Sequence, residues 1–292
     1  MLSVLSAVLQ VACAATDQLK TNSQQFILHS QSNQRDYAIQ IYVPEQPAPK
    51  AGFAVLYLLD GDAIFDSAKQ MSQFLAKPNQ AQADMQPVVI VAIGYPHAEM
   101  GFDKKQRAFD FTPTPIAAQQ QAARVEYGGA AAFATFIEKE LKPVVQEKVT
   151  INTQQQAIYG HSLGGLFVVN LFLKHPQSFQ KFIAASPSIW FNQFQLVQEQ
   201  STWLKQHPSS DAMLMLSYGS NEGLGPSQVS AQQMSSYKKQ FFGRFAARHA
   251  QQTVWVYQHP SEQHLSNFYA SLPKAILLAS CPNRIRCKAL LD

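Results

Sequence analysis

The sequence has little charge, few cysteines and no run of basic residues. Only 14% of its 292 residues are charged, whereas 46% are hydrophobic. Segments that stay disordered carry more charge and fewer apolar residues, so the chain is expected to bury a large core. The 23 Lys and Arg residues are scattered and the net charge is only +4, which excludes a basic surface for nucleic acid. No repeat or linker divides the chain, and residues 16–292 are predicted to form one domain, expected to be a monomer.

The first fifteen residues have the features of a secretory signal peptide, although the basic residues that usually open one are absent. The apolar stretch from Leu2 to Val11 is too short to span a bilayer. Ala12 and Ala14 supply the small residues of an A-x-A cleavage site. We therefore expect a periplasmic or secreted protein. Two alternatives stay open: a lipid anchor on Cys13 after cleavage, or the amino-terminal helix of a cytoplasmic protein.

Only two cysteines, Cys281 and Cys287, remain after such a cleavage. An even pair at short spacing in an exported chain favours a disulfide, here one that ties down the carboxyl-terminal tail. In a cytoplasmic protein they would be two surface thiols.

Eight short apolar runs bounded by turn residues predict eight strands. The first two follow each other closely and are expected to be antiparallel, whereas the later ones alternate with helical patterns, as buried parallel strands do. Helices are predicted over Gly129–Gln146, from Ser162 to Leu173 and roughly from Ser227 to Ala250. The predicted fold is α/β, with a mostly parallel eight-stranded sheet flanked by helices. The predicted strands are Phe26–Leu28, Tyr37–Val43, Phe53–Leu59, Val88–Ile93, Ala157–Tyr159, Phe182–Ala185, Met213–Tyr218 and Thr253–Tyr257.

The segment Gly160-His161-Ser162-Leu163-Gly164 matches G-x-S-x-G and lies between a predicted strand and a predicted helix. This is the setting of the nucleophile in α/β-hydrolases, where glycines leave room for a sharp turn. We therefore predict Ser162 as a nucleophile, the alternative being a serine that only caps the helix. Leu163 N–H is predicted as one oxyanion donor, and Gly61 N–H, in the Asp-Gly turn after an earlier strand, as the second.

His264 and Glu222 are the predicted partners of Ser162, because in this fold the triad follows the chain order serine, acid, histidine. His264 lies on a loop after the last predicted strand, with His259 as the alternative. Glu222 follows a strand and so lies at the carboxyl edge of the sheet, where catalytic groups collect. A Ser–His pair without a carboxylate remains open. The histidines lack zinc-site spacing to cysteines or carboxylates, and neither a metal nor another cofactor is expected.

Several motifs occur in an order that resembles the esterase family of esterase D and the siderophore esterases. The similarity spans roughly Phe26 to Ala279 and is closest to periplasmic hydrolases of enterobactin-type catecholate siderophores. The motifs are Tyr57-Leu58-Leu59-Asp60-Gly61, Arg107-Ala-Phe-Asp110-Phe-Thr112-Pro113, Gly128-Gly129, Gly160-His161-Ser162-Leu163-Gly164-Gly165 and Ala185-Ser186-Pro187-Ser188-Ile189-Trp190.

The resemblance implies hydrolysis of a trilactone siderophore, apo or ferric, through an acyl-enzyme formed on Ser162. It supports His264 as the base and implies that Arg107 lines the cleft, where it binds an anionic catecholate or pairs with Asp110. Other acyl substrates (a feruloyl-type or cell-wall ester, or S-formylglutathione) and a binding protein without turnover are the alternatives. We place Asp60, His161 and Trp190 around the substrate as well, and Trp190, Phe191, Phe102 and Tyr95 are either an aromatic wall or part of the core.

Overall fold

The computed structural model describes residues 22–75, 85–98, 101–117, 125–207, 211–223, 229–248 and 254–292. The predicted signal peptide and Cys13 lie outside the described residues. Within these ranges, no helix is both long enough and apolar enough to cross a membrane.

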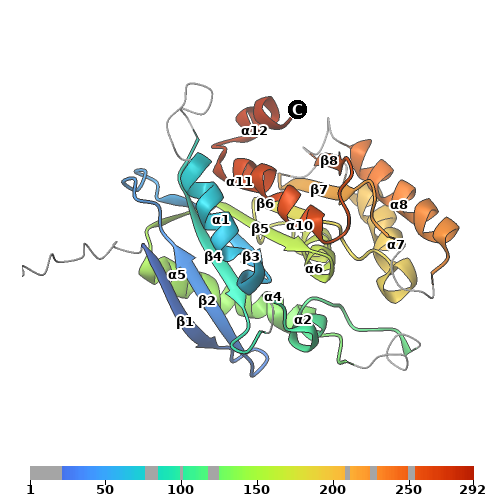
Figure 1. The fold of residues 1–292 in the computed structure, drawn as a ribbon, viewed down its shortest axis with the longest axis horizontal. Helices are drawn as coiled ribbons and strands as arrows, with labels where there is room; N and C mark the ends of the chain where they lie inside the picture. Colours follow the sequence, from blue (N-terminus) through green and yellow to red (C-terminus); the bar gives the residue numbers. More distant parts are fainter. Residues whose placement is uncertain are drawn as a thin grey trace, which may run out of the picture.

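Eight strands form one sheet in the order β1-β2-β4-β3-β5-β6-β7-β8 (Figure 1). β1 pairs with β2 and β2 with β4 antiparallel, and every later pair is parallel. The predicted number of strands, the antiparallel start and the mostly parallel sheet are confirmed. The strands are β1 (Ser23–His29), β2 (Asp36–Tyr42), β3 (Phe53–Leu59), β4 (Val88–Gly94), β5 (Ile151–His161), β6 (Lys181–Ala185), β7 (Met213–Gly219) and β8 (Val254–His259).

The central strands are apolar on both faces because helices cover both faces. In β3 every residue is buried, with Tyr57 and Leu59 on one face and Leu56 and Leu58 on the other. Successive strand residues point to opposite faces, so such a strand reads as a continuous apolar run.

One face of the sheet is covered by α1 (Gly61–Leu75), α10 (Ser266–Ala270), α11 (Leu272–Ser280) and α12 (Arg284–Leu291). The other face is covered by α4 (Ala130–Phe136), α5 (Lys142–Lys148), α6 (Leu163–Lys174), α7 (Phe191–Gln206) and α8 (Ala231–Ala246). A short helix, α2 (Lys104–Asp110), precedes α4 (Figure 1).

Several predicted elements differ from the structure in their extent, and two of these differences have a clear local cause. The helix predicted over Gly129–Gln146 is α4 and α5 joined by a π-helical segment, η3 (Ile137–Leu141), so the apolar pattern continues through a local change of hydrogen bonding. The strand predicted at Ala157–Tyr159 begins already at Ile151, and its first part was missed because residues 152–155 are polar and partly or fully exposed.

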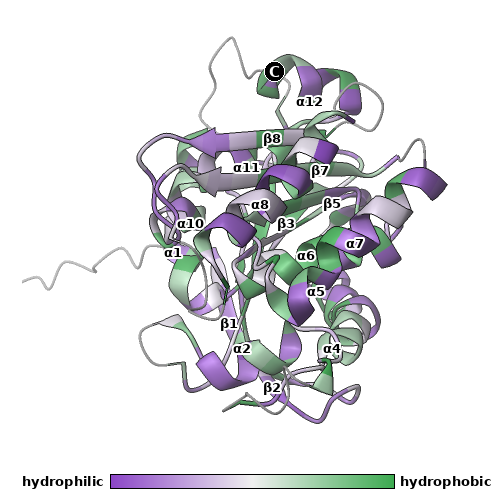
Figure 2. Cartoon of the chain, turned by 90° about the vertical axis from the view of Figure 1, so that its right-hand side faces the viewer, coloured by the Kyte–Doolittle hydropathy of each residue, from purple (hydrophilic) through white to green (hydrophobic). Residues whose placement is uncertain are grey.

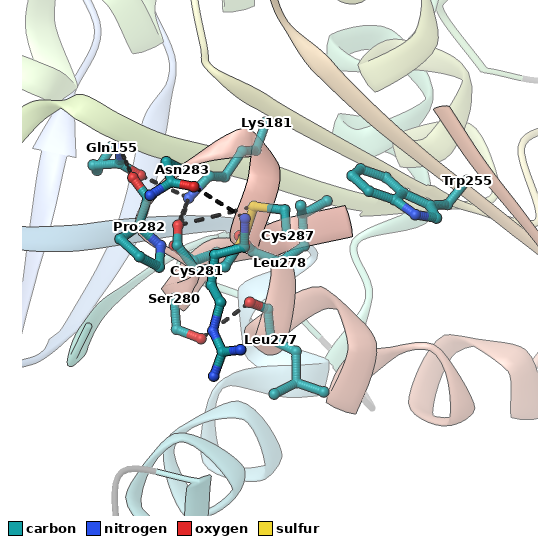
Figure 3. The surroundings of a disulfide bond; sticks show 12 residues. Gln155, Lys181, Trp255, Leu277, Leu278, Ser280, Cys281, Pro282, Asn283 and Cys287 are labelled. Carbon is teal, nitrogen blue, oxygen red and sulfur yellow. Dashed lines mark hydrogen bonds between the residues drawn. A yellow bond between two sulfur atoms is a disulfide. The ribbon is translucent and has the colours of Figure 1, made fainter. Parts of the chain in front are cut away.

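A disulfide between Cys281 and Cys287 holds the segment between α11 and α12, and both cysteines are fully buried (Figure 3). Beside it, buried Lys181 donates hydrogen bonds from Nζ to the carbonyl oxygens of Ala279 (3.0 Å) and Cys281 (2.8 Å) and to Gln155 Oε1 (2.7 Å). Burial lowers the pKa of Lys181 to about 7. These bonds satisfy carbonyls at the end of α11 and attach the tail to the sheet.

Candidate active site

Ser162 lies on a strained turn between β5 and α6. Its φ and ψ angles are 59° and −115°, a conformation that costs free energy for a residue with a side chain. Gly160 makes the turn possible, because a Cβ there would lie 2.4 Å from the carbonyl oxygen of Gly164. Ser162 N–H donates to the carbonyl of Ala185 at 3.0 Å, which attaches the turn to the end of β6. The sequence therefore builds the sharp strand–turn–helix that exposes a serine at the edge of the sheet.

His264 contacts Ser162 directly. Its Nε2 atom lies 3.0 Å from Ser162 Oγ, and its side chain is 47% exposed on the loop between β8 and α10. Ser188 Oγ lies 3.2 Å from the same hydroxyl oxygen. The alternative histidine, His259, instead makes a 2.6 Å hydrogen bond to Asn267. The structure thus brings His264, and not His259, within proton-transfer distance of Ser162.

Glu222 lies behind His264, with its side chain only 4% exposed. Its Oε2 atom is 3.9 Å from His264 Nδ1 and 3.1 Å from Lys238 Nζ. Its Oε1 atom accepts hydrogen bonds from Gly219 N–H (2.7 Å) and from the hydroxyl of Ser186. Although burial opposes ionisation, His264 and these donors together lower the pKa of Glu222 to about 2. The carboxylate is therefore charged at any pH near neutrality.

The two predicted oxyanion donors are the first residues of two helices. Leu163 begins α6 and Gly61 begins α1, so neither amide has a partner within its own helix. The helix dipole adds positive potential at both amides. A Cβ at Gly61 would lie 2.8 Å from Ala92 Cβ and from Ile93 N, so only glycine fits there. The sequence-based interpretation of Gly61 as part of an isolated turn missed this helix.

Arg107 forms a bidentate ion pair with Asp60 and not with Asp110, so the predicted pairing with Asp110 is wrong. The distances are 2.7 Å from Nε to Oδ1 and 2.9 Å from Nη2 to Oδ2, and the Asp60 side chain is fully buried. Arg107 Nη2 also donates to the carbonyl of His161 at 3.4 Å. Burial raises the pKa of Asp110 to about 7, so burial dominates the ionisation of this carboxyl group more than any arginine does.

His161 is buried against Phe268 and supports the loop that carries His264. Its ring stacks 4.8 Å from the ring of Phe268, and its Nε2–H donates to the carbonyl of His264 at 2.7 Å. Burial and the neighbouring His264 lower the pKa of His161 to about 3, so the ring is neutral. Asp60 and His161, both predicted to lie around the substrate, are only 1% and 3% exposed, and their side chains bind protein groups in this structure.

A pocket of about 330 Å³ opens at Ser162 and His264. Trp190 lines it together with Ser188 and Lys238, whereas Phe191 and Tyr95 are buried in the core. Of the two alternatives given for these aromatic residues, Phe191 and Tyr95 therefore belong to the core, and Trp190 belongs to the wall of the pocket. The sequence analysis also missed Ser188, which stands in a quoted motif, and Lys238, which lies on α8 with no motif to mark it.

Comparisons with known proteins agree with this architecture. The Putative esterase family matches residues 30–278. The chain is 38% identical over 172 residues to the ferri-bacillibactin esterase BesA of Bacillus subtilis, covering 57% of this chain and 58% of the relative. It is 35% identical over 210 residues to a siderophore triacetylfusarinine C esterase of Aspergillus fumigatus, covering 69% and 68%. The aligned regions thus span between just over half and about two thirds of these relatives.

The BES protein of Bacillus cereus has a similar crystal structure, with a TM-score of 0.77 and 28% identity over 95% of this chain and 99% of that one. This likeness extends through nearly all of the sheet and its covering helices. Together with the serine turn at the end of β5, it identifies the fold as that of the α/β-hydrolases. The match over residues 30–278 places this chain in the Putative esterase family.

Proposed function

We propose that this protein is a serine esterase that hydrolyses the ester bonds of a catecholate trilactone siderophore through an acyl-enzyme. The observation that carries the proposal is the 3.0 Å contact between Ser162 Oγ and His264 Nε2 at a strained turn. A strained serine in contact with a base is the arrangement that activates a hydroxyl nucleophile.

In this mechanism His264 accepts the proton of Ser162 as Oγ attacks the ester carbonyl. The negative charge that develops on the carbonyl oxygen is stabilised by the N–H groups of Leu163 and Gly61. His264 then protonates the leaving alcohol and activates the water that releases the acid from Ser162. Glu222 stabilises the imidazolium that exists between these proton transfers.

The siderophore substrate is supported by the relatives, two of which are named as esterases of siderophores. The pocket offers Trp190 as a flat apolar surface for an aromatic ring and Lys238 as a cation for a negatively charged complex. The buried Cys281–Cys287 disulfide supports our expectation of an exported protein, because structural disulfides persist in oxidising compartments.

The test is turnover of apo and ferric enterobactin, with p-nitrophenyl acetate measured in parallel and the enterobactin products separated by chromatography. Ser162→Ala should abolish both reactions, whereas the matched surface variant Ser178→Ala should keep them. Release of linear trimer, dimer or monomer by wild type supports a siderophore esterase.

The other outcomes separate the alternatives. Turnover of the acetate alone would keep a serine esterase and reject the siderophore as its substrate, which would then be another acyl ester. Absence of turnover for every ester, combined with no labelling of Ser162 by a fluorophosphonate, would favour a binding protein on the same fold.

A further inference from the structure

A second cavity adjoins the pocket at Ser162 and shares Glu222, Met234 and Lys238 with it. Its volume is about 510 Å³, and it lies between α8 and the carboxyl-terminal ends of β7 and β8. Figure 2 views the molecule from the side on which α8 lies, in front of these strands. A substrate larger than one ester group could therefore extend from Ser162 into this second cavity.

The lining of the second cavity combines an apolar wall with two cations. The rings of Tyr218 and Phe242 stack at 4.3 Å and form the wall. Lys238 and Lys239 lie on α8, and Glu222 is the one carboxylate among the described residues that line the cavity. Two ammonium groups against one carboxylate leave excess positive charge, and a low-dielectric cleft concentrates its field.

The two oxygens of Glu222 have different partners. Oε1 is held by Gly219 N–H and by the Ser186 hydroxyl. Oε2 lies between two competing groups, 3.1 Å from Lys238 Nζ and 3.9 Å from His264 Nδ1. Lys238 thus binds the oxygen that would orient His264. The Lys238 side chain is also 25% exposed, so a ligand can reach it.

We propose that the second cavity binds a carboxylate-bearing part of the ester substrate through Lys238 and Lys239, which for a trilactone is the free carboxylate that the first, ring-opening hydrolysis leaves on the linear ester; this inference rests on the esterase function proposed above. A bound carboxylate competes with Glu222 for the ammonium group of Lys238 and so weakens its hold on Oε2. Oε2 can then accept a hydrogen bond from His264 Nδ1–H. An anionic ester therefore completes the Ser162–His264–Glu222 arrangement, whereas a neutral ester reacts with the acid still held by Lys238.

The experiment compares two p-nitrophenyl esters of similar size and different charge: mono-p-nitrophenyl glutarate, which is an anion, and its methyl ester, which is neutral and one methyl group larger. We expect the wild type to favour the carboxylate ester by at least tenfold in kcat/KM. Lys238→Met should remove this preference from both sides: it slows the anionic ester, which loses its ammonium partner, and it speeds the neutral ester, because Oε2 of Glu222 is then free to face His264 in every turnover. Lys238→Arg should retain most of the preference, and Lys239→Met should lose part of it. Lys205→Met, on the exposed end of α7, is the matched control.

A binding measurement keeps this inference separate from the proposed catalysis. Titration of glutarate into Ser162→Ala should give heat, and the same titration into Ser162→Ala combined with Lys238→Met should show affinity at least tenfold lower. If the wild type hydrolyses neither ester, the esterase function fails and the titration alone decides the anion site. Equal kcat/KM for the two esters in the wild type, or glutarate binding that Lys238→Met leaves unchanged, would overturn the inference.

Discussion

Replacing Glu222 with glutamine tests whether the carboxylate takes part in catalysis. The amide keeps an oxygen for Gly219 N–H and the Ser186 hydroxyl, but it removes the negative charge that faces His264. At the observed separation of 3.9 Å, an imidazolium and a carboxylate attract each other by about 4 kcal/mol at an effective dielectric constant of about 20. Lys238, 3.1 Å from the same oxygen, offsets part of this attraction.

If about 2 to 3 kcal/mol of transition-state stabilisation remains, Glu222→Gln lowers kcat roughly 30- to 200-fold. That loss is smaller than the roughly 10⁴-fold effect known for a triad acid in direct hydrogen bond with its histidine. The assay is steady-state hydrolysis of p-nitrophenyl acetate at pH 8, with Glu199→Gln on α7 as the control and thermal unfolding as the check on folding.

A decrease of less than threefold would refute this reasoning and leave a Ser–His pair that works without an acid. A decrease beyond 10⁴-fold would also refute it, because the carboxylate would then have to contact His264 more closely than the structure shows.

Three further predictions concern stability. Asp60→Asn leaves the buried guanidinium of Arg107 without its counter-ion and should lower the free energy of unfolding by about 3–5 kcal/mol in urea titrations; a change under 1 kcal/mol would contradict the buried pair. Because the pKa of His161 is about 3 in the folded chain, only the unfolded chain binds this proton between pH 6.5 and 3. His161 should therefore contribute a loss of about 1.4 kcal/mol per pH unit as pH falls through this range, measured between pH 6 and 5 as the difference in slope between the wild type and His161→Gln, because the opposing contribution of Asp110 is present in both. Replacing both Cys281 and Cys287 with serine should cost about 2 kcal/mol, the loop entropy of a short disulfide, and an unchanged urea midpoint would show that the bond is not structural.

The sheet could be predicted from sequence because its strands are buried on both faces. β3 and β4 are continuous apolar runs between turn residues. In an α/β chain such a run usually forms a strand that is buried on both faces of the sheet. α1 was missed because it starts directly at Gly61, where Asp60-Gly61-Asp62 suggests a turn. The first residues of β5 were missed because they are polar, and strand prediction depends on apolar alternation.

Within the site, the chain order and the strand ends were enough to bring Ser162, His264 and Glu222 together. Lys238 could not be found in this way, because a lysine on an amphipathic helix has the same local sequence whether it faces solvent or a buried carboxylate. The pairing of Arg107 with Asp60 was missed for a related reason: Asp110, three residues along the chain, was the local candidate. Only the folded structure brings Arg107 of α2 to Asp60, the residue that follows β3.

The side chain of Arg107 holds two strained turns in a fixed position relative to each other. Asp60 and Ser162 both have positive φ angles, 53° and 59°, and each directly precedes the helix whose first amide is a proposed oxyanion donor. The guanidinium of Arg107 binds the carboxylate of Asp60 and also the carbonyl of His161, the residue before Ser162. One side chain thus crosslinks the turn before Gly61 to the turn before Leu163. Oxyanion stabilisation requires both amides to point at one oxygen. The buried, planar guanidinium of Arg107 has several donors in a fixed geometry, so it holds both backbones more rigidly than a flexible lysine would.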